Sequence, residues 1–362
     1  MTRHRRRWFS RSPWLIAFVA SVALVTLGLV VAVTNHALRA RSLYGAAVPR
    51  PGASSPDLSP SPSTSGTASP SASPKRTGAV PPPPVPVPPG TVPPVGAYVR
   101  PGSVGYLGPL SALTVYPHGG AKPAGTTWET YGLQIDGDLT LDHVWVKGSI
   151  YWKGSGTLTI TNSIIDGRDA WYVVYSAGAA KRMVIKNSTL RWDTRAAGAF
   201  PAGYDVAPIW QRGDPVMDIE HNDISGLPQG LNPTAHSIVD GNWIHGLVQN
   251  GGSNGPMHMD GIFSQGGSNI LIQRNYVEVP ATADVTGAIF LQDLDQTDSG
   301  VRVWGNFIKG GPYFNLRNET SLNLDVRNNT FGDDHNARNT PPGTIGAWVD
   351  NVRVDGSSVP QP

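Results

Sequence analysis

The sequence contains no cysteine in its 362 residues. That excludes disulfides, thiolate metal sites and a cysteine nucleophile, but not export, because a long continuous core needs no disulfide support. Charged residues make up only 15% of the chain, and the formal net charge is +2. Most of the basic excess is N-terminal, so the charge gives no reason to expect a nucleic-acid-binding protein. Helical periodicity is nearly absent beyond residue 98, which favours an all-β fold.

The N-terminus carries the strongest localisation signal. Residues 1–13 are rich in arginine, and an uncharged apolar run follows at 14–33. This run has the ~20 residues that a helix needs to cross a bilayer, and the basic flank predicts a cytoplasmic N-terminus. A cleaved signal peptide is the alternative, although no convincing cleavage site follows the run. We expect a single-pass anchor in the cell membrane with an extracellular C-terminal domain, which would be secreted if the run were cleaved.

A linker and one large domain are expected after the anchor. Ser, Pro, Thr and Gly dominate most of residues 34–97. Such a segment cannot form a core, and we expect it to be disordered with polyproline II character. The composition then changes to Gly, Asn, aromatic and β-branched residues. We assign residues 98–357 to a β domain and 358–362 to a tail.

A motif of one aliphatic residue, two variable residues, a central Asn or small substitute, one variable residue and another aliphatic residue recurs along the β domain. Its copies are Leu141-x-x-Val144-x-Val146, Ile160-x-x-Ser163-x-Ile165, Ile185-x-x-Ser188-x-Leu190, Ile219-x-x-Asn222-x-Ile224, Val239-x-x-Asn242-x-Ile244, Ile272-x-x-Asn275-x-Val277, Val303-x-x-Asn306-x-Ile308, Val326-x-x-Asn329-x-Phe331 and Val349-x-x-Val352-x-Val354. Successive centres lie 19 to 34 residues apart.

This spacing predicts a β-solenoid. Stacked repeats share one interior because their parallel strands lie ~4.8 Å apart, and an Asn at each turn can bond to the Asn of the next coil. A propeller or sandwich of hairpins is the alternative, and it would use tight Asp-Gly turns such as Asp136-Gly137. Those dipeptides accompany the same unit each time rather than a hairpin partner. We therefore predict a parallel β-helix.

Residues from about 100 to 336 resemble a family of exported bacterial right-handed parallel β-helix proteins of the pectate-lyase-like superfamily. The stretches that carry the resemblance are His258-x-Asp260-Gly261-Ile262, Ala288-Ile289-Phe290-Leu291-Gln292, Gly310-Gly311-Pro312-Tyr313 and Asn328-Asn329-Thr330-Phe331-Gly332. The resemblance implies the fold more specifically than it implies a chemistry. The Asp-Asp pair that polygalacturonases of this superfamily carry one coil after their Asp-Gly is absent here.

A second strand-like run precedes each motif and should form a flat outer sheet. Alternate residues of these runs face outward, and a slip of one residue would exchange the two faces. Long insertions at 191–205 and 249–257 would wall this sheet into a groove suited to a polysaccharide. The expected substrate-binding residues are Tyr151, Lys153, Gln211, Arg212, Gln265, Gln292 and Asn315. The aromatic residues of these runs, such as Trp171, Trp210 and Phe263, are equally interpretable as core or cap residues.

Four residues are the candidates for catalysis. His258 and Asp260 precede the strand at Gly261, and they are readable as an acid–base pair, as ligands, or as turn residues that bond backbone amides. Asp293 and Arg317 follow in later coils and would step along the same face. Paired carboxylates would suit a hydrolase, whereas His258 with Arg317 would suit a uronate lyase.

No metal site is predicted with certainty. The acidic loop at 293–298 has carboxylates at a spacing that Ca²⁺ accepts, but a surface loop is the favoured interpretation. His221, His236 and His245 are interpreted as turn or surface residues, because their spacing matches no compact zinc site. We expect a monomeric, membrane-anchored β-helix that binds or cleaves an acidic or cell-envelope polysaccharide. A non-catalytic carbohydrate-binding surface and a structural envelope protein are the alternatives.

Overall fold

A computed structural model describes residues 91–129, 132–167, 172–177, 180–192, 209–211, 214–226, 228–248, 259–280, 285–292, 299–311, 314–332 and 337–362. Every described residue belongs to one compact unit, Thr77–Pro362. The predicted segments 1–13 and 14–33, and most of the predicted linker 34–97, lie outside the described residues. Among the described residues, no helix is long and apolar enough to cross a membrane.

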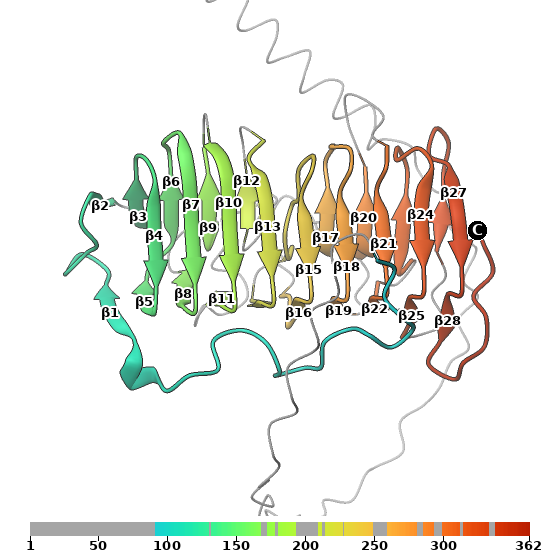
Figure 1. Cartoon of the computed structure of the whole chain (residues 1–362), viewed down its shortest axis with the longest axis horizontal. Coiled ribbons are helices and arrows are strands. Elements are labelled where there is room, and N and C mark those ends of the chain that lie inside the picture. Colours follow the sequence, from blue (N-terminus) through green and yellow to red (C-terminus); the bar gives the residue numbers. More distant parts are fainter. Residues whose placement is uncertain are drawn as a thin grey trace, which may run out of the picture. The chain divides into compact units, whose positions relative to one another are not determined.

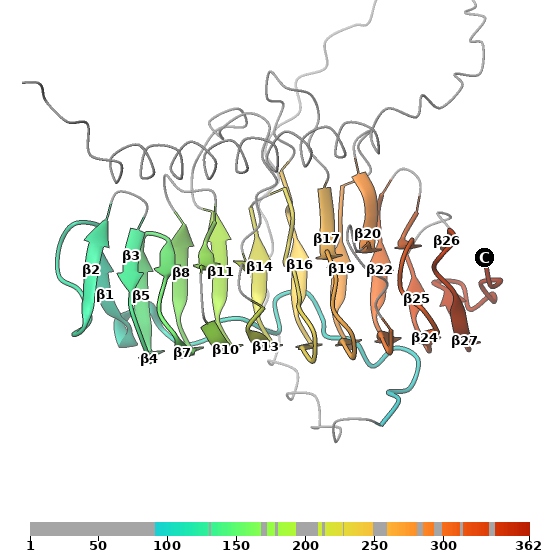
Figure 2. The ribbon, with the colours of Figure 1, turned by 90° about the horizontal axis from the view of Figure 1, so that it is seen from above.

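Stacked parallel strands make up most of the described part, which is all-β as predicted (Figures 1 and 2). Most coils add one strand to each of three sheets, here named B, C and A in the order in which a coil passes through them. The ten strands of sheet A are, in spatial order, β1 (Thr114–Pro117), β5 (Val144–Lys147), β8 (Ile164–Gly167), β11 (Thr189–Trp192), β14 (Asp223–Ser225), β16 (Trp243–His245), β19 (Tyr276–Glu278), β22 (Phe307–Lys309), β25 (Thr330–Phe331) and β28 (Val352–Arg353).

Sheets B and C complete each coil. Sheet C contains the nine strands β4 (Leu139–Asp142), β7 (Gly156–Thr161), β10 (Ala180–Lys186), β13 (Val216–Glu220), β15 (Ile238–Asp240), β18 (Leu271–Gln273), β21 (Arg302–Trp304), β24 (Leu324–Arg327) and β27 (Ile345–Val349). Sheet B has a five-stranded piece with β2 (Thr126–Glu129), β3 (Gly132–Ile135), β6 (Ile150–Trp152), β9 (Val174–Ser176) and β12 (Ile209–Gln211), and a four-stranded piece with β17 (Met259–Ser264), β20 (Val285–Leu291), β23 (Leu316–Asn318) and β26 (Arg338–Asn339). Only the pairing of β2 with β3 is antiparallel among these strands.

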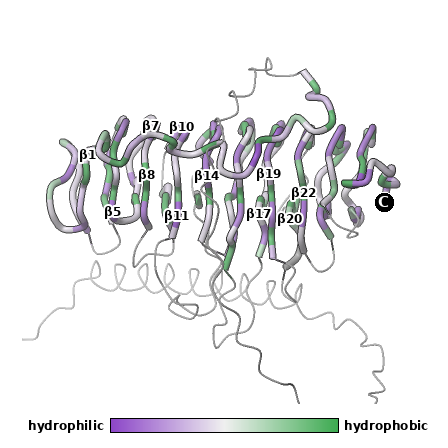
Figure 3. The backbone as a smooth tube through the Cα atoms, turned by 90° about the horizontal axis from the view of Figure 1, so that it is seen from below, coloured by the Kyte–Doolittle hydropathy of each residue, from purple (hydrophilic) through white to green (hydrophobic). Residues whose placement is uncertain are grey.

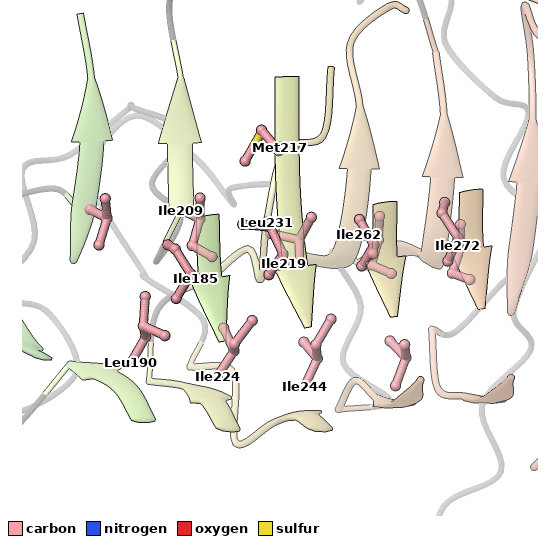
Figure 4. Close-up of a cluster of buried hydrophobic side chains, with 14 of the residues drawn as sticks. Ile185, Leu190, Ile209, Met217, Ile219, Ile224, Leu231, Ile244, Ile262 and Ile272 are labelled. Carbon is pink, nitrogen blue, oxygen red and sulfur yellow. The ribbon is translucent and has the colours of Figure 1, made fainter. Parts of the chain in front are cut away.

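Columns of aliphatic side chains from the three sheets fill the interior. Because side chains alternate along a strand, each motif aims its aliphatic positions inward. In sheet C the register aligns Ile185 with Ile219 and Ile219 with Val239, and all three are fully buried. Figure 4 shows such residues converging from different strands on one core. Each buried side chain of this size contributes about 1.5–3 kcal/mol relative to exposure.

The asparagine column is present as predicted. At the turn between sheets C and A, Asn222, Asn242, Asn275, Asn306 and Asn329 are all fully buried. Each side-chain amide bonds to the Asn of the following coil, from Asn222 through to Asn351. Ser188 and Ser163 continue the column toward the N-terminal end, as the motif suggested.

The last coil differs from the prediction by one residue. Asn329 bonds to Asn351, and Val326 pairs with Trp348, so the final repeat is Trp348-x-x-Asn351-x-Arg353 rather than one centred on Val352. An irregularity of register between Leu324 and Asp325 precedes it.

A second column consists of the residues that immediately precede the central residue of each repeat, and we call it the turn column. Its members have left-handed backbones: His143 (φ 51°), Asn162 (47°), Asn187 (50°), His221 (54°), Gly241 (63°), Arg274 (54°), Gly305 (61°), Asn328 (56°) and Asp350 (50°). Asn, Asp, His and Gly are the residues that adopt this conformation most readily. The sharp corner between sheets C and A therefore has a local cause in the sequence.

Residues 93–113, named the strap, run lengthwise along the turn column (Figures 1 and 3). They run against the order of the coils, from Asn328 back to the start of sheet A. At one end Asn328 Nδ2 donates a hydrogen bond to the Pro93 carbonyl at 2.7 Å. Further along, Val99 N donates to Arg274 O and Gly105 N to His221 O, both at 3.0 Å. Just past the strap, Thr114 N donates to His143 O at 3.0 Å. The last residues of the predicted linker thus already contact the folded unit.

The strap contains tight turns. In one of them Ser103 N donates to Arg100 O (3.0 Å), and Gly102 has φ 73°. Pro at the second position and Gly with positive φ at the third are typical of a type II turn. A short 3₁₀ helix, Leu110–Ala112, ends the strap.

Candidate functional site: the outer face of sheet B

The outward positions of sheet B form a column along its two pieces. In the five-stranded piece, Gln134 pairs with Tyr151, and Tyr151 pairs with Tyr175. In the four-stranded piece, the column contains Phe263, Phe290, Arg317 and Arg338. The neighbouring inward residues, Ile262, Ile289 and Leu316, belong to the core. The predicted outer sheet therefore exists, and its register follows from the alternation.

Aromatic rings stack on one another along this column. Tyr151 and Tyr175 have centroids 5.1 Å apart and nearly parallel planes, and the Lys153 ammonium lies 5.0 Å from the Tyr151 centroid. Phe263 and Phe290 stack in the same way at 5.1 Å. Phe290 keeps only 2% exposure and Phe263 keeps 6%. The phenylalanines thus cover one another's faces, which is closer to the core-or-cap interpretation than to open platforms.

Polar groups surround the end of the phenylalanine stack. The Arg317 guanidinium lies 4.8 Å from the Phe290 centroid and pairs with Glu319. The Gln292 amide donates to the other oxygen of Glu319 at 2.7 Å. Arg317 and Glu319 retain 25% and 18% side-chain exposure. A cation, a carboxylate and an amide therefore meet at one partly exposed place, where they can bind a polar ligand.

Glu319 is the residue of this cluster that sequence reasoning missed. Asn318 pairs with Leu291, and Leu291 with Ser264, so the next residues, Glu319, Gln292 and Gln265, share one outward column. Both glutamines were predicted from their strands. The same coil-to-coil alignment, extended past Arg317, would have identified Glu319.

Asp260 is not exposed to solvent. It is fully buried, and its Oδ1 accepts a hydrogen bond from the backbone N–H of Gly287 at 3.0 Å. The register shifts between Met259 and Asp260, and such a bulge re-aims the side chains of the strand. The contact of Asp260 with a backbone amide is the one that the turn-residue alternative implies.

The remaining predicted residues fall into three groups. Asn315 is buried and donates to Gly310 O at 3.0 Å, so it does not line the outer face as expected. Gln265, like Tyr151 and Lys153, follows the outward register. Outside the residues or side chains that the structure describes lie His258, Asp293, Arg212, Trp171, the side chains of Gln211 and Trp210, and the acidic loop 293–298.

Sheet B is interrupted near its middle. Among the described residues, its two pieces are joined through residues 230–232, where Leu231 bridges to Ile209 on one side and to Ile262 on the other. Beside this bridge the Gln229 side chain is fully buried, and neither end of its amide has a hydrogen-bond partner among the described residues. Asn232 donates to Phe263 O at 2.7 Å. The interruption lies between the stretches of chain that carry the predicted insertions.

The histidines lie apart from this face. His221 and His236 have left-handed backbones in turns, and His245 pairs with Asp223 on sheet A at 2.9 Å. Burial lowers the pKa of His221 from its usual 6.5, so this imidazole is neutral at pH 7. The described residues contain no group of three or more His, Asp or Glu side chains that could hold a metal ion.

Comparison of the chain with protein-family models, with curated proteins and with solved structures gives no match.

Proposed function

We propose that the outer face of sheet B binds an extended acidic or cell-envelope polysaccharide. The cluster of Arg317, Glu319 and Gln292 carries this proposal, because it offers a guanidinium, a carboxylate and an amide on one partly exposed strand face. A guanidinium recognises a uronate carboxylate by paired, charge-assisted hydrogen bonds, and the amide and the carboxylate suit sugar hydroxyls.

The direction of the ligand follows from the column. Tyr151 and Lys153 lie on the same face in the first piece of the sheet, and Arg338 lies one coil beyond Arg317. Coils repeat at ~4.8 Å, so a linear polymer running along the sheet meets a new polar group at each coil. Cations outnumber carboxylates at these positions, which favours an acidic chain over a neutral one.

The finer assignments belong to the same proposal. The coil is right-handed, as ~98% of parallel crossovers are, and it is of the pectate-lyase-like kind. The protein is monomeric, and its apolar segment 14–33 anchors it in the cell membrane with the β domain outside, or is cleaved to release it. Cleavage of the polymer is the second candidate, since Glu319 beside Arg317 supplies a carboxylate base next to a group that neutralises a uronate.

Binding is tested with the full-length chain in detergent by affinity electrophoresis in polygalacturonate, alginate and neutral pullulan. We expect retardation in the acidic polymers, reduced about tenfold in Arg317→Gln because one charge-assisted contact is lost. Arg302→Gln is the matched control, since Arg302 also packs over an aromatic ring, Trp304, but on sheet C. Equal retardation of both variants, or none for the wild type, would overturn the proposal.

Cleavage is tested on the same polymers by following unsaturated products and new reducing ends. Glu319→Gln should abolish both signals while binding persists. Signals that survive in this variant would remove Glu319 from the chemistry and leave the binding proposal intact.

A further inference from the structure

The strap leaves the turn column over two coils. Gly105 N donates to the carbonyl of His221, Tyr106 N donates to Thr189 Oγ1 at 3.1 Å, and the chain next bonds to the turn column at Thr114, to the carbonyl of His143. Between these points, the carbonyl oxygens of Asn162 and Asn187 accept no hydrogen bond from any described residue. The column therefore presents two unused acceptors, ~5 Å apart, beneath the arch of the strap.

A cavity of about 440 Å³ lies under this arch. Its volume is within the ~300–1,000 Å³ of small-ligand sites. The turn column contributes His143, Asn162, Asn187 and His221, and the strap contributes residues 103–109 and Ala112. Figure 3 shows the strap passing over several coils on this side of the molecule, away from sheet B.

The floor of the cavity offers both donors and acceptors. The Asn187 side chain, which ends in an amide, is exposed. The Asn162 amide donates to Asp142 at 2.9 Å, and Asp142 also bonds to His143 at 2.8 Å. These bonds hold the two side chains in place, and they leave the backbone carbonyls and the Asn187 amide available to a ligand.

The roof of the cavity is apolar and uncharged. Residues 103–112 contain no charged side chain. The Tyr106 hydroxyl donates to Pro109 O at 2.7 Å, which fixes the ring as a wall of the cavity. Leu107, Pro109 and Ala112 complete the apolar side. A neutral ligand is therefore favoured, because the arch provides no counter-charge for an ion.

We propose that this cavity binds one neutral sugar residue. A pyranose ring has hydroxyls around its edge and an apolar face, which match the carbonyl and amide floor and the Tyr106 side respectively. The cavity is separate from sheet B, so sugar binding here does not depend on polysaccharide binding to the outer face of sheet B.

The test uses methyl NMR of the full-length chain in detergent, titrated to millimolar concentrations with glucose, galactose, mannose and N-acetylglucosamine. The methyls of Leu107 and Ala112 should shift with at least one neutral sugar, whereas the core methyl of Ala288 in sheet B should not. Charged analogues, glucuronate and glucosamine, should bind about tenfold more weakly.

Variants assign the binding to the cavity. Asn187→Gly removes the amide but keeps the left-handed backbone, and it should weaken the shift at Leu107 about tenfold. Asn323→Gly is the matched control, because Asn323 is exposed and has φ 53° in a different turn. Ala112→Phe, at an exposed position, should fill the cavity and abolish the shift at Leu107. Absence of any shift, or equal shifts in Asn187→Gly and Asn323→Gly, would overturn the proposal.

Discussion

The Oδ1 of Asn306 accepts two hydrogen bonds from Asn275, one from its backbone N–H at 2.9 Å and one from its side-chain amide at 3.0 Å. The Asn275 amide also donates to Val239 O in the preceding coil at 2.9 Å. One side chain therefore links three successive coils. Both residues are fully buried, so removing the side chain leaves the groups that it bonded away from bulk solvent.

Asn275→Ala should lower the free energy of unfolding by about 2–4 kcal/mol, since it leaves more than one buried polar group without a partner. Chemical denaturation of the full-length chain, followed by circular dichroism, measures the change. Asn323→Ala, at an exposed turn position, is the control and should lower the free energy of unfolding by less than about 1 kcal/mol. If both variants lost the same free energy of unfolding, the asparagine column would contribute no more stability than an exposed asparagine does.

The asparagine column was predictable because it repeats a short local pattern in coil after coil. The final coil was not, because both Trp348 and Val349 are apolar and either fits the first position of the motif. The irregular pairing between β24 and β27 then selects Trp348. Local composition could not reveal that shift, since it depends on the contact between coils.

The same physical cause decides which positions of the predicted site residues could be derived from the sequence. Gln265, Gln292 and Arg317 were predictable from alternation within regular strands. Asp260 was not, because the irregularity after Met259 turns its carboxylate toward a backbone amide. Sheet alternation is readable in sequence, whereas a bulge of this kind is not.

The type II turn in the strap should be sensitive to a β-branched residue. Gly102 has φ 73° with no neighbour near its Cβ position, so backbone strain is the only penalty there. Gly102→Val should destabilise the chain by about 1–3 kcal/mol, whereas Gly102→Asn should cost less because Asn tolerates this conformation. Hydrogen exchange at the amides of Val99 and Gly105, which bond the turn column, should accelerate in the valine variant. Unchanged exchange there would mean that the turn does not hold the strap.

Asp142 should give a specific acid response. Hydrogen bonds from Thr161, Asn162 and His143 lower its pKa from 3.8 to about 2. Because the pKa is lower in the folded state, the stabilisation is complete above pH 3.8 and is lost as the pH falls toward 2. The side chain is 48% exposed, so solvent screening limits the effect to below about 1 kcal/mol.

The stability difference between wild type and Asp142→Asn should therefore shrink between these pH values in acid titrations of the unfolding midpoint. Asp136→Asn, which removes a carboxylate bonded to one side chain only, is the control. A difference that stays constant with pH would contradict the assignment.

Asp260 allows a structural role to be separated from a chemical one. Its carboxylate accepts the N–H of Gly287, and an amide oxygen in Asp260→Asn can accept the same bond. Asp260→Ala leaves that buried N–H without this acceptor and should lower the free energy of unfolding by about 1–3 kcal/mol, whereas Asp260→Asn should cost less. If the carboxylate only supports the strand corner, polymer binding should be unchanged in Asp260→Asn. Loss of polymer cleavage in a stable Asp260→Asn variant would instead return the carboxylate to the chemistry, because only the protonation behaviour of the side chain has then been removed.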